Sequence, residues 1–268
     1  MEEEKLSLLE YIWRNCYQIV VWEREKNHES FPTIFGNGFI MYINGEYIFI
    51  TADHVIHELD YEKEERTGKE YDYALVNNIN GNGISTMFTN ISGFYYSESY
   101  NFGRFLEGKE ELDVALIPYL EDYAVSFIGK ELPCPFLTHD LRIDNDIIVK
   151  EKLSKLNLNP ESVGNPSTSM NYFVMGVLPN QFNGIIWERT NAFYYDIKFE
   201  KEEMELYKFR HSCTINEENW SGLSGAPFYD SEGHLVGMLI KVVDGDDIIW
   251  VMPIRKILRF INITKQIE

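Results

Sequence analysis

The chain has 268 residues, of which 44% are hydrophobic and 15% aromatic, and its formal net charge at pH 7 is −19. This composition is typical of a folded, strand-rich protein with a sizeable core. The negative charge opposes binding to a phosphate backbone, so we expect no nucleic-acid partner. No run of about 18 apolar residues could span a bilayer and no secretory segment is present, so we expect no membrane partner.

The cysteines predict a reducing compartment. Cys16, Cys134 and Cys213 are far apart and odd in number, and they lack the Cys/His spacing of a metal site. We therefore expect three free thiols and a cytoplasmic location.

In chain order, the apolar pattern predicts mainly strands, with a helix near each end. The first helix, over residues 5–14, has Leu6, Leu9, Ile12 and Trp13 on one face. The dipeptide Asn44-Gly45 favours a type I′ turn and predicts a hairpin of residues 38–43 and 46–50. Further strands are predicted at residues 17–22, 73–76, 114–117, 172–177, 192–197 and 235–240, and a second amphipathic helix after Pro253.

Polar segments interrupt this pattern. Residues 58–70 are charged, residues 77–83 are rich in Asn and Gly, and residues 150–169 are polar, so we expect surface loops there. A break at residues 118–133 separates the chain into two halves. Strands between two terminal helices suggest two antiparallel barrels or a sandwich.

Residues 221–228, Ser-Gly-Leu-Ser-Gly-Ala-Pro-Phe, surround Ser224 with small residues. Such residues let the backbone turn sharply and point its N–H groups inward, as an oxyanion hole requires. We expect the N–H groups of Gly222 and Ser224 to form that hole. On its own, the string also fits an ordinary β-turn with an incidental serine.

His54 and Asp113 supply the other groups that acyl transfer by a serine needs, a base near the hydroxyl and an acid that orients the base. His54 directly follows the second strand of the hairpin, and Asp113 precedes the apolar residues 114–117. Alone, each also fits a structural role. Together they predict Ser224 as nucleophile, His54 as general base and Asp113 as orienting acid.

The strings T-A-x-H, D-[IV]-A-L and G-x-S-G-x-P, in this order, resemble the three signatures of trypsin-like (chymotrypsin-fold) serine peptidases. They occupy residues 51–54, 113–116 and 222–227, and the resemblance extends over about residues 17–262. The segments 36–39, 176–179 and 235–238 are also similar to that family. Without a signal segment or disulfide framework, the chain resembles intracellular, bacterial-type members.

The resemblance implies a mainly all-β fold of two antiparallel six-stranded barrels, with His54 and Asp113 in the first barrel and Ser224 in the second. It implies a serine endopeptidase that acts on a protein or peptide substrate through an acyl-enzyme and needs no cofactor or metal. The expected division is an N-terminal helix (1–16), a first barrel (17–120), a second barrel (121–253) and a C-terminal helix (254–268).

The chain departs from the family pattern at three positions. Leu223 stands where secreted members carry an aspartate that pairs with a newly cut N-terminal amine, so we expect the chain to be competent without that cleavage or to be switched by a regulatory protein partner. Ala226 replaces a glycine, a small change. Asp53 replaces a small residue and is either a surface cap on the following turn, which we favour, or a second acid acting on His54.

The cleaved residue depends on a substrate pocket beside the serine, where the resemblance places Glu218 at the floor. A partly desolvated carboxylate there would favour Lys or Arg before the cleaved bond. Val242 stands where open-pocket relatives have glycine, and its branched side chain would instead favour small or aliphatic residues. Glu217 and Glu218 also fit the solvated acidic surface of this chain.

Two other functions fit parts of this sequence. An α/β-hydrolase esterase would need G-x-S-x-G with its acid and histidine after the serine, but position 226 is Ala and only His234 follows Ser224. A catalytically inactive binding or scaffold module of the same fold is the second alternative, because a fold does not guarantee its chemistry.

Overall fold

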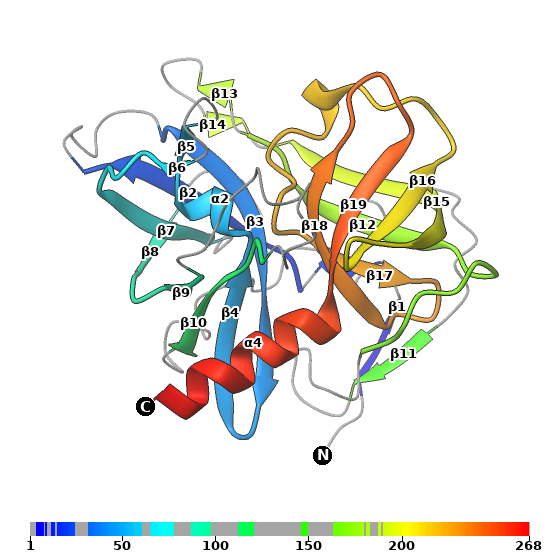
Figure 1. The fold of residues 1–268 in the computed structure, drawn as a ribbon, viewed down its shortest axis with the longest axis horizontal. Helices are drawn as coiled ribbons and strands as arrows, with labels where there is room; N and C mark the ends of the chain where they lie inside the picture. The colour runs from blue at the N-terminus through cyan, green and yellow to red at the C-terminus, as the bar shows by residue number, and fades with distance from the viewer. Residues whose placement is uncertain are drawn as a thin grey trace.

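The structure is a computed structural model of the full chain. It describes residues 4–7, 9, 12–13, 15–24, 32–60, 65–77, 87–97, 112–120, 146–149, 163–179, 181–182, 187–188 and 190–267. Two β bodies lie side by side, and helix α4 (Ile254–Ile267) runs from the lower edge of one body across the front of β3 and β4 in the other (Figure 1).

The first body is a curled sheet of seven strands in the order β8-β7-β2-β3-β4-β10-β9, which we call the N-terminal sheet. Its neighbouring strands are all antiparallel. The strands are β2 (Tyr17–Glu23), β3 (Ile34–Ile43), β4 (Glu46–Thr51), β7 (Tyr71–Asn77), β8 (Met87–Ile91), β9 (Tyr95–Tyr96) and β10 (Ala115–Leu120).

The second body is a closed barrel of six antiparallel strands in the order β12-β15-β16-β19-β18-β17, which we call the C-terminal barrel. The mainly β architecture predicted from the sequence is therefore confirmed. The strands are β12 (Tyr172–Val177), β15 (Asn191–Glu203), β16 (Leu206–His211), β17 (Pro227–Asp230), β18 (Leu235–Val242) and β19 (Ile248–Pro253).

Short elements complete the fold. Three small two-stranded sheets pair β1 (Glu4–Ser7) with β11 (Asp146–Val149), β5 (Leu59–Asp60) with β6 (Glu65–Arg66), and β13 (Gln181–Phe182) with β14 (Trp187–Glu188). Helix α2 (Asp53–Ile56) follows β4. A 3₁₀ helix (Glu217–Asn219) precedes residues 220–226, which we call the Ser224 loop. No helix in the described part of the chain is long and apolar enough to cross a membrane.

The β3–β4 hairpin forms as predicted because its turn residues adopt the left-handed conformation that a type I′ turn needs. Asn44 has φ of 56° and Gly45 has φ of 91°. The turn fixes a register in which Gly38 lies opposite Thr51. This register determines which residues lie at the strand end where His54 follows.

Helix α4 packs against both bodies, as the apolar spacing after Pro253 predicted. It contacts β10 of the N-terminal sheet and β18 and β19 of the C-terminal barrel. Its residues Ile254, Ile257 and Ile261 are buried in one apolar cluster with residues of both bodies, such as Phe49 and Met238. The helix therefore joins the two halves through a shared core.

Two expectations are corrected. The predicted helix over residues 5–14 is wrong at its start, because residues 4–7 pair as a strand with β11. Leu9, Ile12 and Trp13 are helical and buried. The predicted break starts too early at Pro118, since β10 continues through it to Leu120 with a register shift between Ile117 and Leu120. Such an irregularity accommodates a residue without an N–H donor.

The first barrel takes the form of the N-terminal sheet, which is a curled half-barrel. It has seven described strands where the sequence predicts six, and its end strands, β8 and β9, do not pair with each other. Most of the predicted polar segment 150–169 and the rest of the predicted break lie outside the described residues.

Candidate active site

Strand register brings His54 and Asp113 together. Strands β4 and β10 are antiparallel neighbours, and Thr51 lies opposite Ala115. His54 comes three residues after Thr51, and Asp113 comes two residues before Ala115, so both leave the sheet at the same end. Pairing of two adjacent strands therefore places residues that are far apart in the sequence side by side.

Asp113 holds His54 at two points. Its Oδ2 lies 2.7 Å from His54 Nδ1, and its Oδ1 accepts a hydrogen bond from the His54 backbone N–H at 3.1 Å. The Asp113 side chain is 3% exposed, whereas the imidazole is 23% exposed. A buried carboxylate thus fixes one ring nitrogen of a histidine that remains accessible.

The Ser224 loop is attached to the same end of the N-terminal sheet. The Asn37 backbone N–H, from β3, donates to the Ser224 carbonyl at 2.8 Å. The Asn37 carbonyl accepts a hydrogen bond from Thr51 Oγ1 at 2.7 Å, at the end of β4. These bonds join the serine loop of the C-terminal barrel to the strands from which His54 emerges.

Two glycines with positive φ shape the loop, with φ of 89° at Gly222 and 86° at Gly225. A Cβ atom at Gly225 would lie 1.9 Å from the Asn37 carbonyl oxygen, so only glycine allows this approach of the two bodies.

The backbone amides of the loop differ in whether they are hydrogen-bonded within the protein. The amides of Leu223, Gly225 and Ala226 donate to Trp220, Leu239 and Leu223 carbonyls, respectively. Among the described residues, the amides of Gly222 and Ser224 have no acceptor. These are the donors expected for the oxyanion hole.

Asp53 has neither of its two predicted roles, a surface cap or a second acid acting on His54. Its side chain is 0% exposed, so the favoured interpretation as a surface cap is wrong. Arg66 Nη2 donates to its Oδ2 at 2.7 Å, and His57 Nδ1 lies 2.8 Å from its Oδ1. Asp53 therefore anchors β6 and the residue after α2, and the partner of this buried acid is His57 rather than His54.

Glu218 lies on the surface. It is exposed within the 3₁₀ helix, and its neighbour Glu217 is exposed as well. In this structure Glu218 is therefore not the partly desolvated carboxylate that would favour basic substrates. Val242 is half-buried at the end of β18 and packs against the barrel core.

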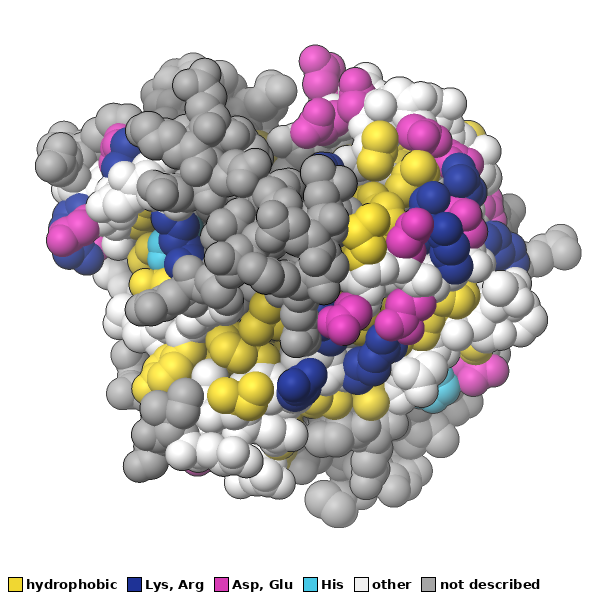
Figure 2. Space-filling model, in the orientation of Figure 1, with side chains coloured by type: hydrophobic (Ala, Val, Ile, Leu, Met, Phe, Trp, Pro, Cys, Tyr) yellow, Lys and Arg dark blue, Asp and Glu magenta, His cyan; other side chains and the backbone are white. Residues whose placement is uncertain are grey.

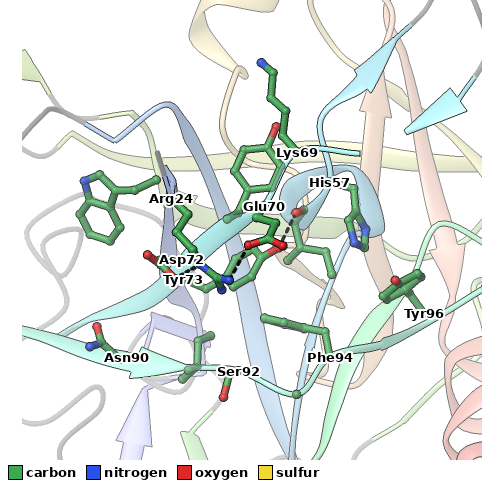
Figure 3. Close-up of a pocket in the computed structure, with 15 residues that line it drawn as sticks. Arg24, His57, Lys69, Glu70, Asp72, Tyr73, Asn90, Ser92, Phe94 and Tyr96 are labelled. Carbon is green, nitrogen blue, oxygen red and sulfur yellow. Dashed lines mark hydrogen bonds and ion pairs between the residues drawn. The ribbon is translucent and has the colours of Figure 1, made fainter. Parts of the chain in front are cut away.

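A cavity of about 640 Å³ lies on the N-terminal sheet and is separate from Ser224. Figure 3 shows His57 and Tyr96 at one side of it and the Arg24 ion pairs with Glu70 and Asp72 across its wall. Its second cation, Lys69, pairs with Glu23 and Glu58. The charges at this cavity thus neutralise one another.

The surface of the C-terminal barrel is similarly mixed. Figure 2 shows Lys and Arg side chains among Asp and Glu side chains on this face. Arg210 Nε lies 2.6 Å from Glu200 Oε2, and Lys208 Nζ lies 3.7 Å from the same oxygen. These basic groups are paired on the surface.

Sequence reasoning missed the role of Asn37. The segment Gly36-Asn37-Gly38-Phe39 was noted, but only as a general similarity. The signal that could have identified it is a polar amide between two glycines at the start of a buried strand, where an amide needs buried partners.

Comparisons with known proteins support the fold. No family model and no curated protein matches the chain. Neuropsin, a serine protease expressed in the limbic system of mouse brain, is 13% identical with a TM-score of 0.52, over 98% of this chain and 99% of that one. Rv3671c protease in an inactive form (12% identity, TM-score 0.46) and Deg5 (16%, 0.46) each match 94% of this chain and 89% of theirs. The chain has the double-barrel fold of trypsin-like serine proteases.

Proposed function

We propose that this chain is a serine endopeptidase that hydrolyses peptide bonds through an acyl-enzyme. The observation that carries the proposal is the two-point contact between His54 and the buried carboxylate of Asp113, at the sheet end where the Ser224 loop is attached. In the proposed mechanism, His54 is the general base, Asp113 its orienting acid and Ser224 the nucleophile.

The geometry supports acylation as follows. Ionised Asp113 can only accept a hydrogen bond, so neutral His54 carries its ring proton on Nδ1 and leaves Nε2 as the acceptor. Ser224 Oγ gives its proton to Nε2 as it bonds to the substrate carbonyl carbon. The carbonyl oxygen becomes an oxyanion, which the N–H groups of Gly222 and Ser224 stabilise.

The remaining steps use the same groups. The imidazolium gives its proton to the leaving amine as the C–N bond breaks, which leaves Ser224 as an ester. Water then loses a proton to His54 and attacks the ester, and His54 returns that proton to Ser224 Oγ as the acid product leaves.

Active-site labelling tests the proposal. A fluorophosphonate should label Ser224 in the purified protein, and Ser224→Ala or His54→Ala should lower kcat on peptides by about four or more orders of magnitude. His234→Ala is the matched control, because His234 is also paired with a buried aspartate, at 3.1 Å from Asp230. Equal activity in wild type and Ser224→Ala would refute the mechanism.

The alternative function is a catalytically inactive binding or scaffold module. This alternative would be favoured if folded wild-type protein were not labelled by the fluorophosphonate and cleaved no member of a broad peptide library.

The same library addresses substrate choice. Because Glu218 is exposed, we propose that small or aliphatic residues before the cleaved bond are preferred, with Val242 narrowing the pocket. Glu218→Gln should leave the preference unchanged, and Val242→Gly should broaden it. A preference for Lys or Arg that Glu218→Gln removes would restore Glu218 to the pocket.

We further propose that the chain needs no newly cut N-terminal amine for activity, and that it works in the cytoplasm. Leu223 is wholly buried in the apolar core and offers no charge for such an amine. Cys16 and Cys213 are free thiols, as expected of a reducing compartment, and Cys134 lies outside the described residues. An N-terminal extension that abolishes activity until it is trimmed would contradict the first point, and cell fractionation tests the second.

A further inference from the structure

Asn37 makes hydrogen bonds to two parts of the opposite body through one side chain. Its Nδ2 donates to the Gly222 carbonyl at 2.6 Å and to the Val177 carbonyl at 3.0 Å. Its Oδ1 accepts from the Val177 N–H at 2.9 Å and from Cys16 Sγ at 3.3 Å. The residue is 0% exposed, so these bonds replace all contact with water.

The backbone of Asn37 reaches the same loop. Its N–H donates to the Ser224 carbonyl, as described above, so a single residue holds both the Gly222 and the Ser224 carbonyl groups. Leu223, between these residues, is apolar and contributes no polar contact through its side chain. The N-terminal sheet therefore holds two carbonyl groups of the loop, those that flank Leu223.

The held carbonyl groups determine where the free amides point. The Leu223 carbonyl accepts from Ala226 N–H at 2.9 Å, which fixes the peptide plane that carries the Ser224 N–H on its opposite side. Gly222 has no Cβ and φ of 89°, so its own backbone is intrinsically permissive. The Asn37 amide restrains the Gly222 backbone by binding the Gly222 carbonyl, which belongs to the peptide plane between Gly222 and Leu223.

We propose that Asn37 is a positioning residue for the oxyanion hole, which keeps the Gly222 N–H aligned with that of Ser224 by binding the Gly222 carbonyl across the two bodies. The inference rests on the proposed peptidase function. Preorganised donors are effective because they need no reorganisation during the reaction. Losing the Asn37 amide should therefore weaken transition-state binding more than substrate binding.

A matched pair of variants separates positioning from stability. Gln18 lies opposite Asn37 in the β2–β3 register, is 2% exposed, and its Nε2 donates to the Leu178 carbonyl at 3.2 Å. It thus supplies a second buried amide between the bodies. Asn37→Leu and Gln18→Met each replace the amide with an apolar side chain. Leucine keeps the branch point of asparagine at Cγ, and methionine keeps the approximate length of glutamine.

The first experiment measures peptide turnover and inhibition by a peptide boronate, which forms a tetrahedral adduct with a serine. Asn37→Leu should lower kcat and boronate affinity by about 10- to 100-fold, less than the loss of a direct donor, with KM within about threefold. Gln18→Met should leave these constants within about threefold of wild type. Equal effects of the two variants, or an effect of Asn37→Leu on KM alone, would overturn the proposal.

The second experiment does not depend on activity. In protein labelled with ¹⁵N-glycine, the Gly222 amide resonance, assigned through its loss in Gly222→Ala, should shift or broaden in Asn37→Leu and stay in place in Gln18→Met. An unchanged Gly222 resonance in Asn37→Leu would overturn the proposal even in an active enzyme.

If Asn37→Leu does not fold, Asn37→Asp serves in both experiments, because it retains an acceptor but loses the donor to Gly222. Absence of turnover in wild type would instead refute the peptidase function, and the resonance would still decide the role of Asn37.

Discussion

Both carboxylate oxygens of Asp113 contact His54, one at the ring Nδ1 and the other at the backbone N–H. Asp113→Asn keeps the shape but presents an amide, which favours the wrong imidazole tautomer. We expect kcat to fall by about four orders of magnitude, with fluorophosphonate labelling of Ser224 slowed in parallel. A fall below about tenfold in steady-state assays would show that Asp113 does not orient the base.

The buried pair of Asp53 and Arg66 should contribute to stability. Asp53 is fully buried and Arg66 is 19% exposed, so loss of one partner leaves a poorly solvated charge. Arg66→Met should lower the free energy of unfolding in urea by about 3 kcal/mol. The double variant Asp53→Leu/Arg66→Met should lose about 2 kcal/mol less than the sum of the two single variants. Additive losses would show that the two residues do not interact.

The close contact between Gly225 and Asn37 predicts that a side chain at position 225 would push the two bodies apart. An alanine there meets both an unfavourable positive φ and the Asn37 carbonyl, so Gly225→Ala should cost about 2–5 kcal/mol. Gly245→Ala is the control, because Gly245 has φ of 74° but nothing within 4 Å of an added Cβ. It should cost only about 1–2 kcal/mol in the same urea titration. Equal costs would mean that close approach at Gly225 is unimportant.

The described cysteines should differ in reactivity. Burial raises the pKa of the Cys16 thiol, so little thiolate forms at pH 8, and its Sγ donates to Asn37. Cys213 is exposed. Iodoacetamide at pH 8 should modify Cys213 first and Cys16 only after denaturation, as followed by peptide mass spectrometry. Rapid modification of Cys16 in native protein would contradict this.

The parts of the fold that could be predicted are those set by local patterns. Asn44-Gly45 determines its own turn, and the isoleucines after Pro253 determine their own helix face. The helix prediction for residues 5–14 was wrong at its start because β1 forms only when β11, more than 130 residues later, supplies its hydrogen bonds. Tertiary pairing therefore determines where the helix can begin, and local periodicity carries no information about that pairing.

The candidate site divides in the same way. His54, Asp113 and Ser224 stand in short strings whose chemistry is visible in the sequence. Asp53 was misjudged because Arg66, its partner, lies in a charged segment that was expected to be a surface loop. Asn37 acts through the Val177 and Gly222 carbonyls, which are 140 and 185 residues away, and no spacing rule connects such positions.

Helix α4 also has a consequence for biosynthesis. It follows every strand of both bodies in the chain, yet it packs on β10, β18 and β19 together. While the ribosome is still translating the final turns, the apolar surface that Ile257 and Ile261 will cover stays open to water and to other nascent chains. The apolar core between the N-terminal sheet and the C-terminal barrel is therefore completed only after α4 has left the exit tunnel, so a nascent chain that stalls before this helix would leave that apolar surface exposed to aggregation.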